Sequence, residues 1–509
     1  MKTKAFPLKL MAMLAILITP ACTDEETTGE STQTPPPDIT GGTVELSSTG
    51  EQANVTIPIS TPWEASSSAD WLQLSQMGGK GGETVQVIAA RNVTGQDRTG
   101  YIRFSDTPGT KSAADSTEIV VHQPADETAS PGVVLTEAYY SDGNVYVKIY
   151  NGRESSSSMQ QLDIVAGSDF SFTDPDALYP GKAPIVYIGQ GEDYLASPYV
   201  LLDGNGMAEG KFSIAGEPSV NTLRVKQNIV CTEMGQLGNE GSATLHFTDG
   251  STIYYGGGIV KDTDLGLGEH VYSTEFRSYD TATGEEKQYA DIPDTGAGFC
   301  WDGTPFIIGG SAVYRLSDDD WSVVTSRSGA VLAAAIDGNE VYAVTPDAVQ
   351  TYVLDTDDSG VVTMSETASA PHGVYFNDVK VTTDDDGATW LLDDMSHAAH
   401  RVADGSLESF DCQPADSLGT TFQFIGVCGG CIYAFNDETV TRYAIGDENP
   451  EPLKMLGGFE WYGETECVNG VLYNFGGTTS FRGTATASHE LRRFVPSDYV
   501  PISVAIMPE

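Results

Sequence analysis

A turn followed by an apolar strand recurs six times in the second half of the chain, and this repetition constrains the fold more than any other feature. The turns are Asp249-Gly250, Asp302-Gly303, Asp337-Gly338, Asp386-Gly387, Gly429-Gly430 and Asn469-Gly470. Their second residues are 53, 35, 49, 43 and 40 positions apart. Apolar strands precede and follow each turn, so each repeat holds about four short strands. Because one such unit cannot bury its apolar faces alone, we expect the repeats to stack into a closed ring.

The repeat region, residues 240–508, resembles a kelch-type β-propeller. The resemblance rests on the Asp-Gly turns, an aromatic residue such as Phe306, the double glycine Gly309-Gly310 and Tyr279-Asp280. Only some copies keep the double glycine, and the Trp of the fourth strand is mostly absent. The resemblance implies six blades, with the first strand near 243–247 and the last near 502–507. If the blades run from inner to outer strand in chain order, no strand is shared between the two ends, and side-chain packing must close the ring.

Residues 39–125 predict a β-sandwich, because short alternating apolar runs are separated by Gly and Pro turns. The landmarks of this module are Trp63, Asp70-Trp71-Leu72, Gly79 to Gly82, Asn92, Arg98-Thr99-Gly100 and His122-Gln123-Pro124. In this order they resemble a BACON domain, an Ig-like module of Bacteroidetes surface proteins. The family name implies carbohydrate binding. We nevertheless expect Trp63 and Trp71 to fill the core of so small a sandwich, which makes the module a spacer.

Residues 131–236 contain further strands at the same spacing, for example 145–149, 185–188 and 199–202. They predict a second Ig-like β-sandwich. The alternative is that these strands supply blades to the propeller. The expected fold class is therefore all-β, with one or two Ig-like sandwiches followed by a six-bladed propeller.

The N-terminus is expected to direct export. Lys2, Lys4 and Lys9 flank an apolar run, 10–18, that is too short to span a bilayer. Ala21-Cys22 and the acidic residues that follow resemble a Bacteroidetes lipoprotein signal, although Thr19 and Pro20 depart from the usual pattern. The resemblance implies that residues 1–21 are removed, that Cys22 carries lipid, and that the protein is anchored in the outer membrane at the cell surface. Residues 22–38, rich in Thr, Ser, Gln and Pro, form a linker. The alternatives are a purely solvated acidic tether and a periplasmic orientation.

Composition excludes several classes of function. Only 19% of the residues are charged and 55 are Gly, which favours turn-rich β structure over coiled coil or disorder. The chain has 26 basic and 72 acidic residues, a formal net charge of −46. Because this charge repels phosphate backbones, nucleic acid is not an expected partner.

The predicted ligand site lies on one face of the ring, where the loops after the second and fourth strands of each blade meet. Long insertions fall there, at 256–274, 367–378, 457–466 and 476–490. They carry Lys261, His270, His372, Tyr375, Trp461, Tyr462, Phe481 and Arg482. Aromatic faces can stack on a pyranose, while Arg and His donate to hydroxyls or carboxylates. The alternative is that these side chains only anchor their loops.

Two other patterns suggest metal or redox chemistry, and both have simpler explanations. Asp355, Asp357, Ser359 and Glu366 match the spacing of a calcium-binding EF-hand loop, but the flanking residues predict a strand hairpin with an acidic turn. Cys428-Gly-Gly-Cys431 matches a CxxC motif, but it brackets a two-residue hairpin turn. We expect two buried thiols or a local disulfide there. No cofactor is expected, with calcium as the alternative.

The function favoured by these patterns is noncovalent binding of a glycan or another extracellular ligand, in the use of polysaccharide or mucin. The chain shows no nucleophile elbow, phosphate loop or zinc-binding helix motif, so catalytic residues are not assigned. The first alternative is a propeller enzyme of the sugar epimerase or oxidase type. The second is a protein-interaction accessory of an outer-membrane transporter in a glycan-uptake system.

Overall fold

The computed structural model describes most of the chain beyond residue 37. The described residues are 38–39, 42–57, 59–106, 116–127, 133–141, 143–152, 162–166, 170–171, 193–203, 205–214, 222–228, 231–263, 270–377, 379–413, 422–436, 439–446, 450–456, 463–481 and 484–508. The predicted signal peptide and Cys22 lie outside them. Within these ranges the regular elements are β-strands and one short 3-10 helix, η2 (Pro496–Asp498), which confirms the all-β fold class. None of the described elements is an apolar helix long enough to cross a membrane.

The first module is a sandwich of two sheets formed within residues 38–123. One sheet has the order β1 (Asp38–Ile39), β3 (Glu51–Thr56), β7 (Thr84–Ala89), β5 (Leu72–Leu74). The other has the order β2 (Gly42–Glu45), β9 (Ser116–Gln123), β8 (Arg98–Asp106), β4 (Trp63–Ser67), β6 (Gly78–Gly79). Trp63 is 1% exposed and Trp71 is 9% exposed, and both belong to the core between the sheets. The expectation that these two aromatic residues fill the core is confirmed.

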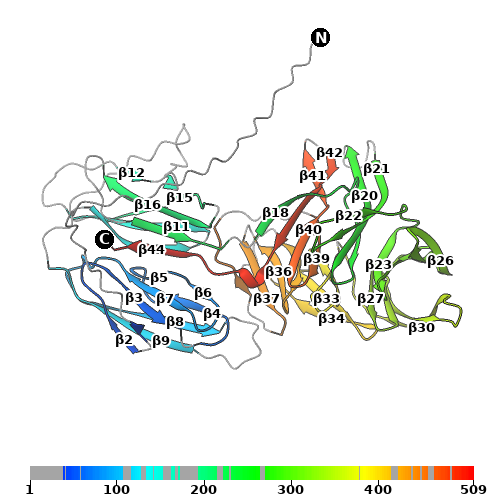
Figure 1. Cartoon of the computed structure of the whole chain (residues 1–509), viewed down its shortest axis with the longest axis horizontal. Coiled ribbons are helices and arrows are strands. Elements are labelled where there is room, and N and C mark those ends of the chain that lie inside the picture. The colour runs from blue at the N-terminus through cyan, green and yellow to red at the C-terminus, as the bar shows by residue number, and fades with distance from the viewer. Residues whose placement is uncertain are drawn as a thin grey trace, which may run out of the picture. The chain divides into compact units, whose positions relative to one another are not determined.

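The second module is also built from two facing sheets, but it is not contiguous in sequence. Its first sheet contains β10 (Val133–Ser141), β11 (Asn144–Asn151) and β14 (Asp193–Ala196). Its second contains β12 (Leu162–Ala166), β16 (Met207–Ile214), β17 (Thr222–Lys226) and β44 (Ser503–Met507), and a small pair joins β13 (Phe170–Ser171) to β15 (Tyr199–Val200). The last strand of the chain, red in Figure 1, therefore lies in the same sheet as β16 and not in the ring. Its Val504 and Ile506 side chains enter the sandwich core.

The placement of β44 corrects the prediction that residues 502–507 form the last propeller strand. All five residues of β44 are buried, so its sequence looks like that of an inner blade strand. Its partner is β17, with Leu223 opposite Ile506 and Val225 opposite Val504. Without β44, the apolar face and the hydrogen-bonding edge of β17 would be exposed, which is the physical reason for this pairing.

The repeat region folds, in its described part, into six blades of four strands each, and two further strands extend the sheet of blade 1. Blade 1 contains β19 (Leu245–Thr248), β20 (Thr252–Thr263), β21 (His270–Asp280) and β22 (Glu286–Gln288). Blade 2 contains β23 (Gly296–Trp301), β24 (Thr304–Gly309), β25 (Ala312–Ser317) and β26 (Asp320–Ser326). Blade 3 contains β27 (Ala333–Asp337), β28 (Glu340–Val344), β29 (Ala348–Thr356) and β30 (Val362–Pro371). Blade 4 contains β31 (Val379–Thr383), β32 (Thr389–Asp393), β33 (Ala398–Ala403) and β34 (Ser406–Asp411).

Blade 5 contains β35 (Phe422–Cys428), β36 (Cys431–Asn436), β37 (Thr439–Ala444) and β38 (Glu451–Pro452). Blade 6 contains β39 (Glu464–Val468), β40 (Val471–Phe475), β43 (Glu490–Phe494) and β18 (Cys231–Gln236). Contacts between neighbouring blades run from β19 to β23 and β27, then through β32, the second strand of blade 4, to β35, β39 and back to β19. The blades are therefore arranged as a closed propeller (Figure 1).

The recurrent turns owe their composition to backbone geometry. Asp302-Gly303, Gly429-Gly430 and Asn469-Gly470 have positive φ at both residues, between 48° and 76°. Two-residue hairpin turns of this kind match the twist of the flanking strands, and Gly, Asn and Asp tolerate the left-handed conformation best. The turns therefore lie between the first and second strands of their blades.

Ring closure differs from the prediction that side-chain packing alone would close the ring. β18 precedes blade 1 in the chain, yet it pairs with β43 as the outer strand of blade 6, with Cys231 opposite Phe494 and Gln236 opposite Glu490. The sequence of β18 lacks apolar alternation because most of its side chains are partly or fully exposed. Backbone hydrogen bonds between β18, which precedes the repeat region, and β43, near its end, thus close the ring and cover the edge of β43.

Buried polar side chains connect the inner strands at the ring centre. Strand β31 contacts both β39 and β19. His246 Nδ1 lies 2.7 Å from Glu466 Oε1, and His246 Nε2 lies 3.2 Å from Glu464 Oε2. The backbone N–H of Thr383 donates to Glu466 Oε2 at 2.9 Å. Blades 1, 4 and 6 are therefore joined at the axis by one network of charged hydrogen bonds.

Candidate functional site

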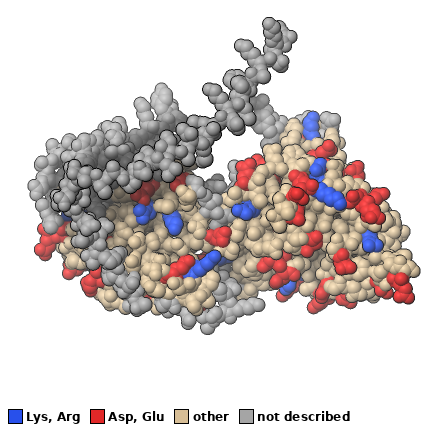
Figure 2. All heavy atoms as spheres, in the orientation of Figure 1, with Lys and Arg blue, Asp and Glu red and all other residues tan. Residues whose placement is uncertain are grey.

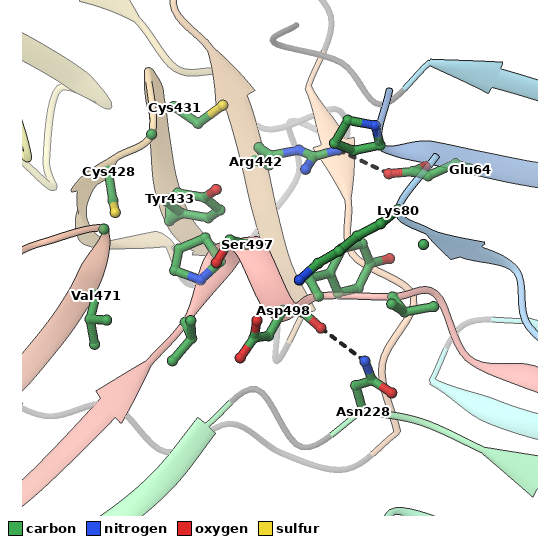
Figure 3. Close-up of a pocket in the computed structure, with 18 of the residues that line it drawn as sticks. Glu64, Lys80, Asn228, Cys428, Cys431, Tyr433, Arg442, Val471, Ser497 and Asp498 are labelled. Atoms are coloured by element: carbon green, nitrogen blue, oxygen red, sulfur yellow. Dashed lines mark hydrogen bonds and ion pairs between the residues drawn. The ribbon is translucent and has the colours of Figure 1, made fainter. Parts of the chain in front are cut away.

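A cleft lies between the first sandwich and the propeller. Its volume is about 820 Å³, within the range of about 300–1,000 Å³ typical of small-ligand sites. Trp63, Glu64, Lys80 and neighbouring residues of the first sandwich form one wall. The opposite wall comes from turns between the first and second strands of blades 4, 5 and 6, with the segment 495–500 around η2 between them (Figure 3).

The polar side chains of the cleft come from every wall. Lys80, Arg442, Asn228 and Asp498 provide both hydrogen-bond donors and acceptors, and Tyr433 adds an aromatic ring (Figure 3). The Asn228 side-chain amide donates to the backbone oxygen of Asp498 at 3.1 Å. A ligand in this cleft can therefore meet hydroxyl, amide, cationic and carboxylate groups together.

One cation holds the two sides of the cleft together. Arg442, 6% exposed, donates to Glu451 Oε2 at 2.7 Å within blade 5 and to Glu64 Oε1 at 3.2 Å on β4. Burial and the neighbouring Glu451 raise the pKa of Glu64, while Arg442 opposes that shift. Burial by itself lowers the pKa of Arg442, but Glu451 and Glu64 outweigh it and raise that pKa. The bridge is therefore ionic, and each carboxylate depends on the shared guanidinium.

Two thiols and a carboxylate meet in the propeller wall of the cleft. Asp385 lies in the turn after β31, Cys428 ends β35, and Cys467 lies in β39. Their ligand-type atoms all lie within 4.8 Å of one another. Asp385 is exposed, whereas Cys428 and Cys467 are each 1% exposed. Among the described residues, this is the group of at least three such side chains that is close enough to hold a metal ion.

The expectation of two buried thiols at Cys428 and Cys431 is confirmed, but the sequence did not identify Cys467 as a further neighbour of Cys428. Cys428 and Cys431 are opposite each other across the Gly429-Gly430 turn, and all six described cysteines are free thiols in the structure. Cys467 was missed as a partner because it belongs to the next blade. The available sequence signal was the position of Cys467 near the end of the strand before the Asn469-Gly470 turn, one residue further from its turn than Cys428 is from Gly429-Gly430.

The predicted ligand face is described only in part. Trp461, Tyr462 and Arg482 lie outside the described residues, as does the side chain of Phe481 on β41 (Thr478–Phe481). Two of the insertions do come together, because β42 (Thr484–Ala487) pairs with β20 at Lys261 opposite Thr486. Together with β41, it extends the blade 1 sheet. Gly257 and Gly258, both with positive φ, lie where β20 shifts register to enter this extension.

His270 and His372 of that prediction contact neighbouring groups, whereas Tyr375 is exposed. His270 Nδ1 lies 3.0 Å from Asp262 Oδ1 on the paired strand β20. His372 Nε2 lies 3.0 Å from the carbonyl oxygen of Thr345, and its ring packs against Phe376. Tyr375 is 81% exposed. Their role in ligand binding stays a prediction.

The calcium pattern lies on a hairpin. Asp355 is in β29 and Glu366 is in β30, opposite Tyr352. Asp357 Oδ1 accepts hydrogen bonds from the backbone N–H groups of Ser359 and Val361, at 2.8 and 2.9 Å. The acidic residue thus caps a tight turn between two strands, as the flanking sequence predicts.

Comparisons with known proteins concern separate parts of the chain. Residues 61–123 match the BACON family, described as "Putative binding domain, N-terminal". No curated protein matches the chain.

Among solved structures, a catalytically inactive virginiamycin B lyase from Staphylococcus aureus with quinupristin is 11% identical, covers 52% of this chain and 98% of its own, and has a TM-score of 0.30. YCF48 bound to D1 peptide is 12% identical, covers 52% and 95%, and has a TM-score of 0.30. A Bacteroides ovatus GH5 xyloglucanase in complex with a heptasaccharide is 23% identical over 18% of each chain, with a TM-score of 0.15.

Proposed function

We propose that the protein is an exported lipoprotein, anchored through Cys22 at the surface of a Bacteroidetes-type outer membrane, that binds an extracellular glycan without cleaving it. On this proposal the ring is a kelch-type propeller and the two sandwiches hold it away from the membrane. The observation that carries the proposal is the cleft between the BACON-matching sandwich and blades 4 to 6, because it combines a suitable volume with polar groups from both modules.

Charge supports a neutral ligand over a polyanion. The net charge is −46, and on the described part of the face drawn in Figure 2 Asp and Glu cover more of the surface than Lys and Arg. Within the cleft, Arg442 is engaged by Glu64 and Glu451, whereas Lys80 points into the open space (Figure 3). A sugar hydroxyl can accept from Lys80 and donate to Asp498 without bringing a net charge.

A glycan array of mucin and plant polysaccharide fragments, probed with residues 39–509, tests the proposal. For a ligand so found, Lys80→Ala and Asn228→Ala should each weaken binding about tenfold or more, since each removes a polar contact. Lys287→Ala, which removes the same charge from the exposed ion pair with Asp319, is the matched control and should leave affinity unchanged. Unchanged binding by both cleft variants would exclude this cleft as the glycan site.

The opposite face is a second candidate, favoured by the pairing of β42 with β20. This pairing brings two of the long insertions into one sheet beside His270. Trp461→Ala and Arg482→Ala would then abolish binding while the cleft variants retain it. Turnover of a glycan by the purified protein would instead support the epimerase or oxidase alternative, and capture by an outer-membrane transporter would support the accessory alternative.

A further inference from the structure

Three blades contribute one ligand-type side chain each to the cluster of Asp385, Cys428 and Cys467, referred to here as the thiol cluster. The three residues are far apart in sequence, and the packing of blades 4, 5 and 6 against one another brings them together. Asp385 and Cys428 also line the cleft, so the cluster has a path to solvent even though both sulfur atoms belong to buried residues.

The backbone around the cluster fixes its geometry. The N–H of Gly429 donates to Asp385 Oδ1 at 2.8 Å, which ties the carboxylate of blade 4 to the turn of blade 5. The neighbouring Asp384 accepts from the Trp390 indole N–H at 2.8 Å and from the backbone N–H groups of Asp386 and Ala388. The turn that carries Asp385 is therefore held at both ends, and the ligand set is largely preorganised.

The electrostatic environment of the thiol cluster disfavours an unpaired anion and favours a bound cation. Asp385 places a carboxylate beside the two sulfur atoms, and the ligand-type atoms of the three residues all lie within 4.8 Å of one another. This carboxylate would stabilise a bound divalent ion by direct charge attraction. A coordinating thiol loses its proton to such an ion, so metal binding reverses the local charge balance.

We propose that Asp385, Cys428 and Cys467 form a binding site for a thiophilic divalent cation of the zinc class, with a fourth coordination position open to the cleft. Two sulfur ligands and one oxygen ligand suit zinc, which accepts thiolate and carboxylate in tetrahedral sites. With Zn–S distances of about 2.3 Å, neighbouring ligands in such a site lie about 3.7 Å apart. The observed limit of 4.8 Å requires only a small contraction of side chains.

Cobalt supplies a direct test, because tetrahedral Co²⁺ bound to thiolates has charge-transfer and d–d absorption bands. The purified full chain, reduced and freed of metal with a chelator, is titrated with Co²⁺ and then with Zn²⁺. One Co²⁺ per chain should bind with a thiolate spectrum, Zn²⁺ should remove that spectrum, and about two protons should be released per ion as the thiols ionise. This test needs no glycan, so its failure is separate from failure of the proposed ligand cleft.

Variants identify the ligands. Cys428→Ser and Cys467→Ser should abolish the thiolate spectrum, whereas Cys412→Ser, which also alters a buried cysteine, should keep it. Asp385 is exposed, so Asp385→Asn should fold normally and weaken Zn²⁺ binding by at least about tenfold, the loss that even outer-shell partners cause. A full thiolate spectrum in Cys428→Ser, unchanged affinity in Asp385→Asn, or a Cys428–Cys467 disulfide found by mass spectrometry in the isolated protein would each overturn the site.

Discussion

The two sandwiches differ in which segments of the chain complete their sheets and cores. The first completes both of its sheets within residues 38–123, and its core is formed entirely from that segment. The second leaves β17 at the edge of its sheet until β44 returns from the far end of the chain. The comparison shows that similar patterns of short strands can describe a self-sufficient module and a module that depends on a distant segment.

The propeller likewise depends on a strand from outside its own repeats, in this case one that comes from the N-terminal side. β18, which follows the second sandwich, completes blade 6, and β44, which follows blade 6, completes the second sandwich. The second sandwich and the propeller thus exchange strands, while the first sandwich contributes none. We therefore expect the first sandwich to tolerate damage that unfolds its neighbours.

Removing residues 501–509 should produce the largest difference between the sandwiches. Ile502, Val504 and Ile506 each lose a buried position worth about 1.5–3 kcal/mol, and β17 loses its ladder. The second sandwich should lose its calorimetric transition and become sensitive to protease. The first sandwich should keep its transition at a lower temperature, because its own core stays complete while the outer-face contacts of Ile88 with Ala505 and Met507 and the hydrogen bond from Ser503 to the Leu74 carbonyl are lost. Equal loss of both transitions would contradict the comparison, and removal of Glu509 alone is the control.

A matched pair of core substitutions sharpens the comparison. Ile506→Ala and Ile102→Ala each remove a side chain that is at most 3% exposed, and each should cost about 2–5 kcal/mol. The first should lower the transition of the second sandwich, and the second should lower that of the first sandwich. Calorimetry of both variants measures this, and a shift of the wrong transition would show that the modules unfold together.

The bridge at the cleft tests how far the first sandwich is coupled to the ring. Arg442→Met leaves Glu64 and Glu451 without their shared cation and should cost about 2–3 kcal/mol, less than a fully buried pair because both carboxylates are partly exposed. The loss should shrink as pH falls, since protonation removes the unpaired charges. Arg103→Met, in the exposed pair with Glu118, should cost less than about 1 kcal/mol. Comparable losses in thermal melts at pH 7 would argue against the bridge.

The smallest effect is expected from pH at the ring centre. Burial opposes the charged form of His246, but hydrogen bonds to Glu464 and Glu466 raise its pKa to about 10. A folded pKa above the unfolded value of about 6.5 stabilises the ring fully below pH 6.5, and this stability falls by about 1.4 kcal/mol per pH unit up to about pH 10. The propeller transition should therefore decline more steeply than that of the first sandwich between pH 7.5 and 8.5. In His246→Gln the two slopes should agree, and a steep slope that persists there would exclude His246 as its source.

Much of the architecture follows from local sequence, and the exceptions have physical causes. The Asp-Gly and Asn-Gly turns indicate where blades begin because hairpin geometry demands those residues. β18 gives no such signal, since an outer blade strand needs no apolar alternation. β44 is apolar after Ser503, which indicates that it is buried but not against which sheet. At the candidate site, Cys428 was visible as part of a CxxC pattern, whereas its contact with Cys467 depends on the packing of one blade against the next.

The exchange of β18 and β44 has a mechanical consequence. Two stretches of backbone, one leading into β18 and one leaving β43, cross between the second sandwich and the propeller, and Asn228 of the first is hydrogen-bonded to Asp498 of the second. If a single peptide joined the propeller to the second sandwich, the propeller could rotate about that peptide. Two connecting segments resist such rotation. A force applied to the propeller would be shared by both crossings and would reach the second sandwich without pulling the ring open from either end.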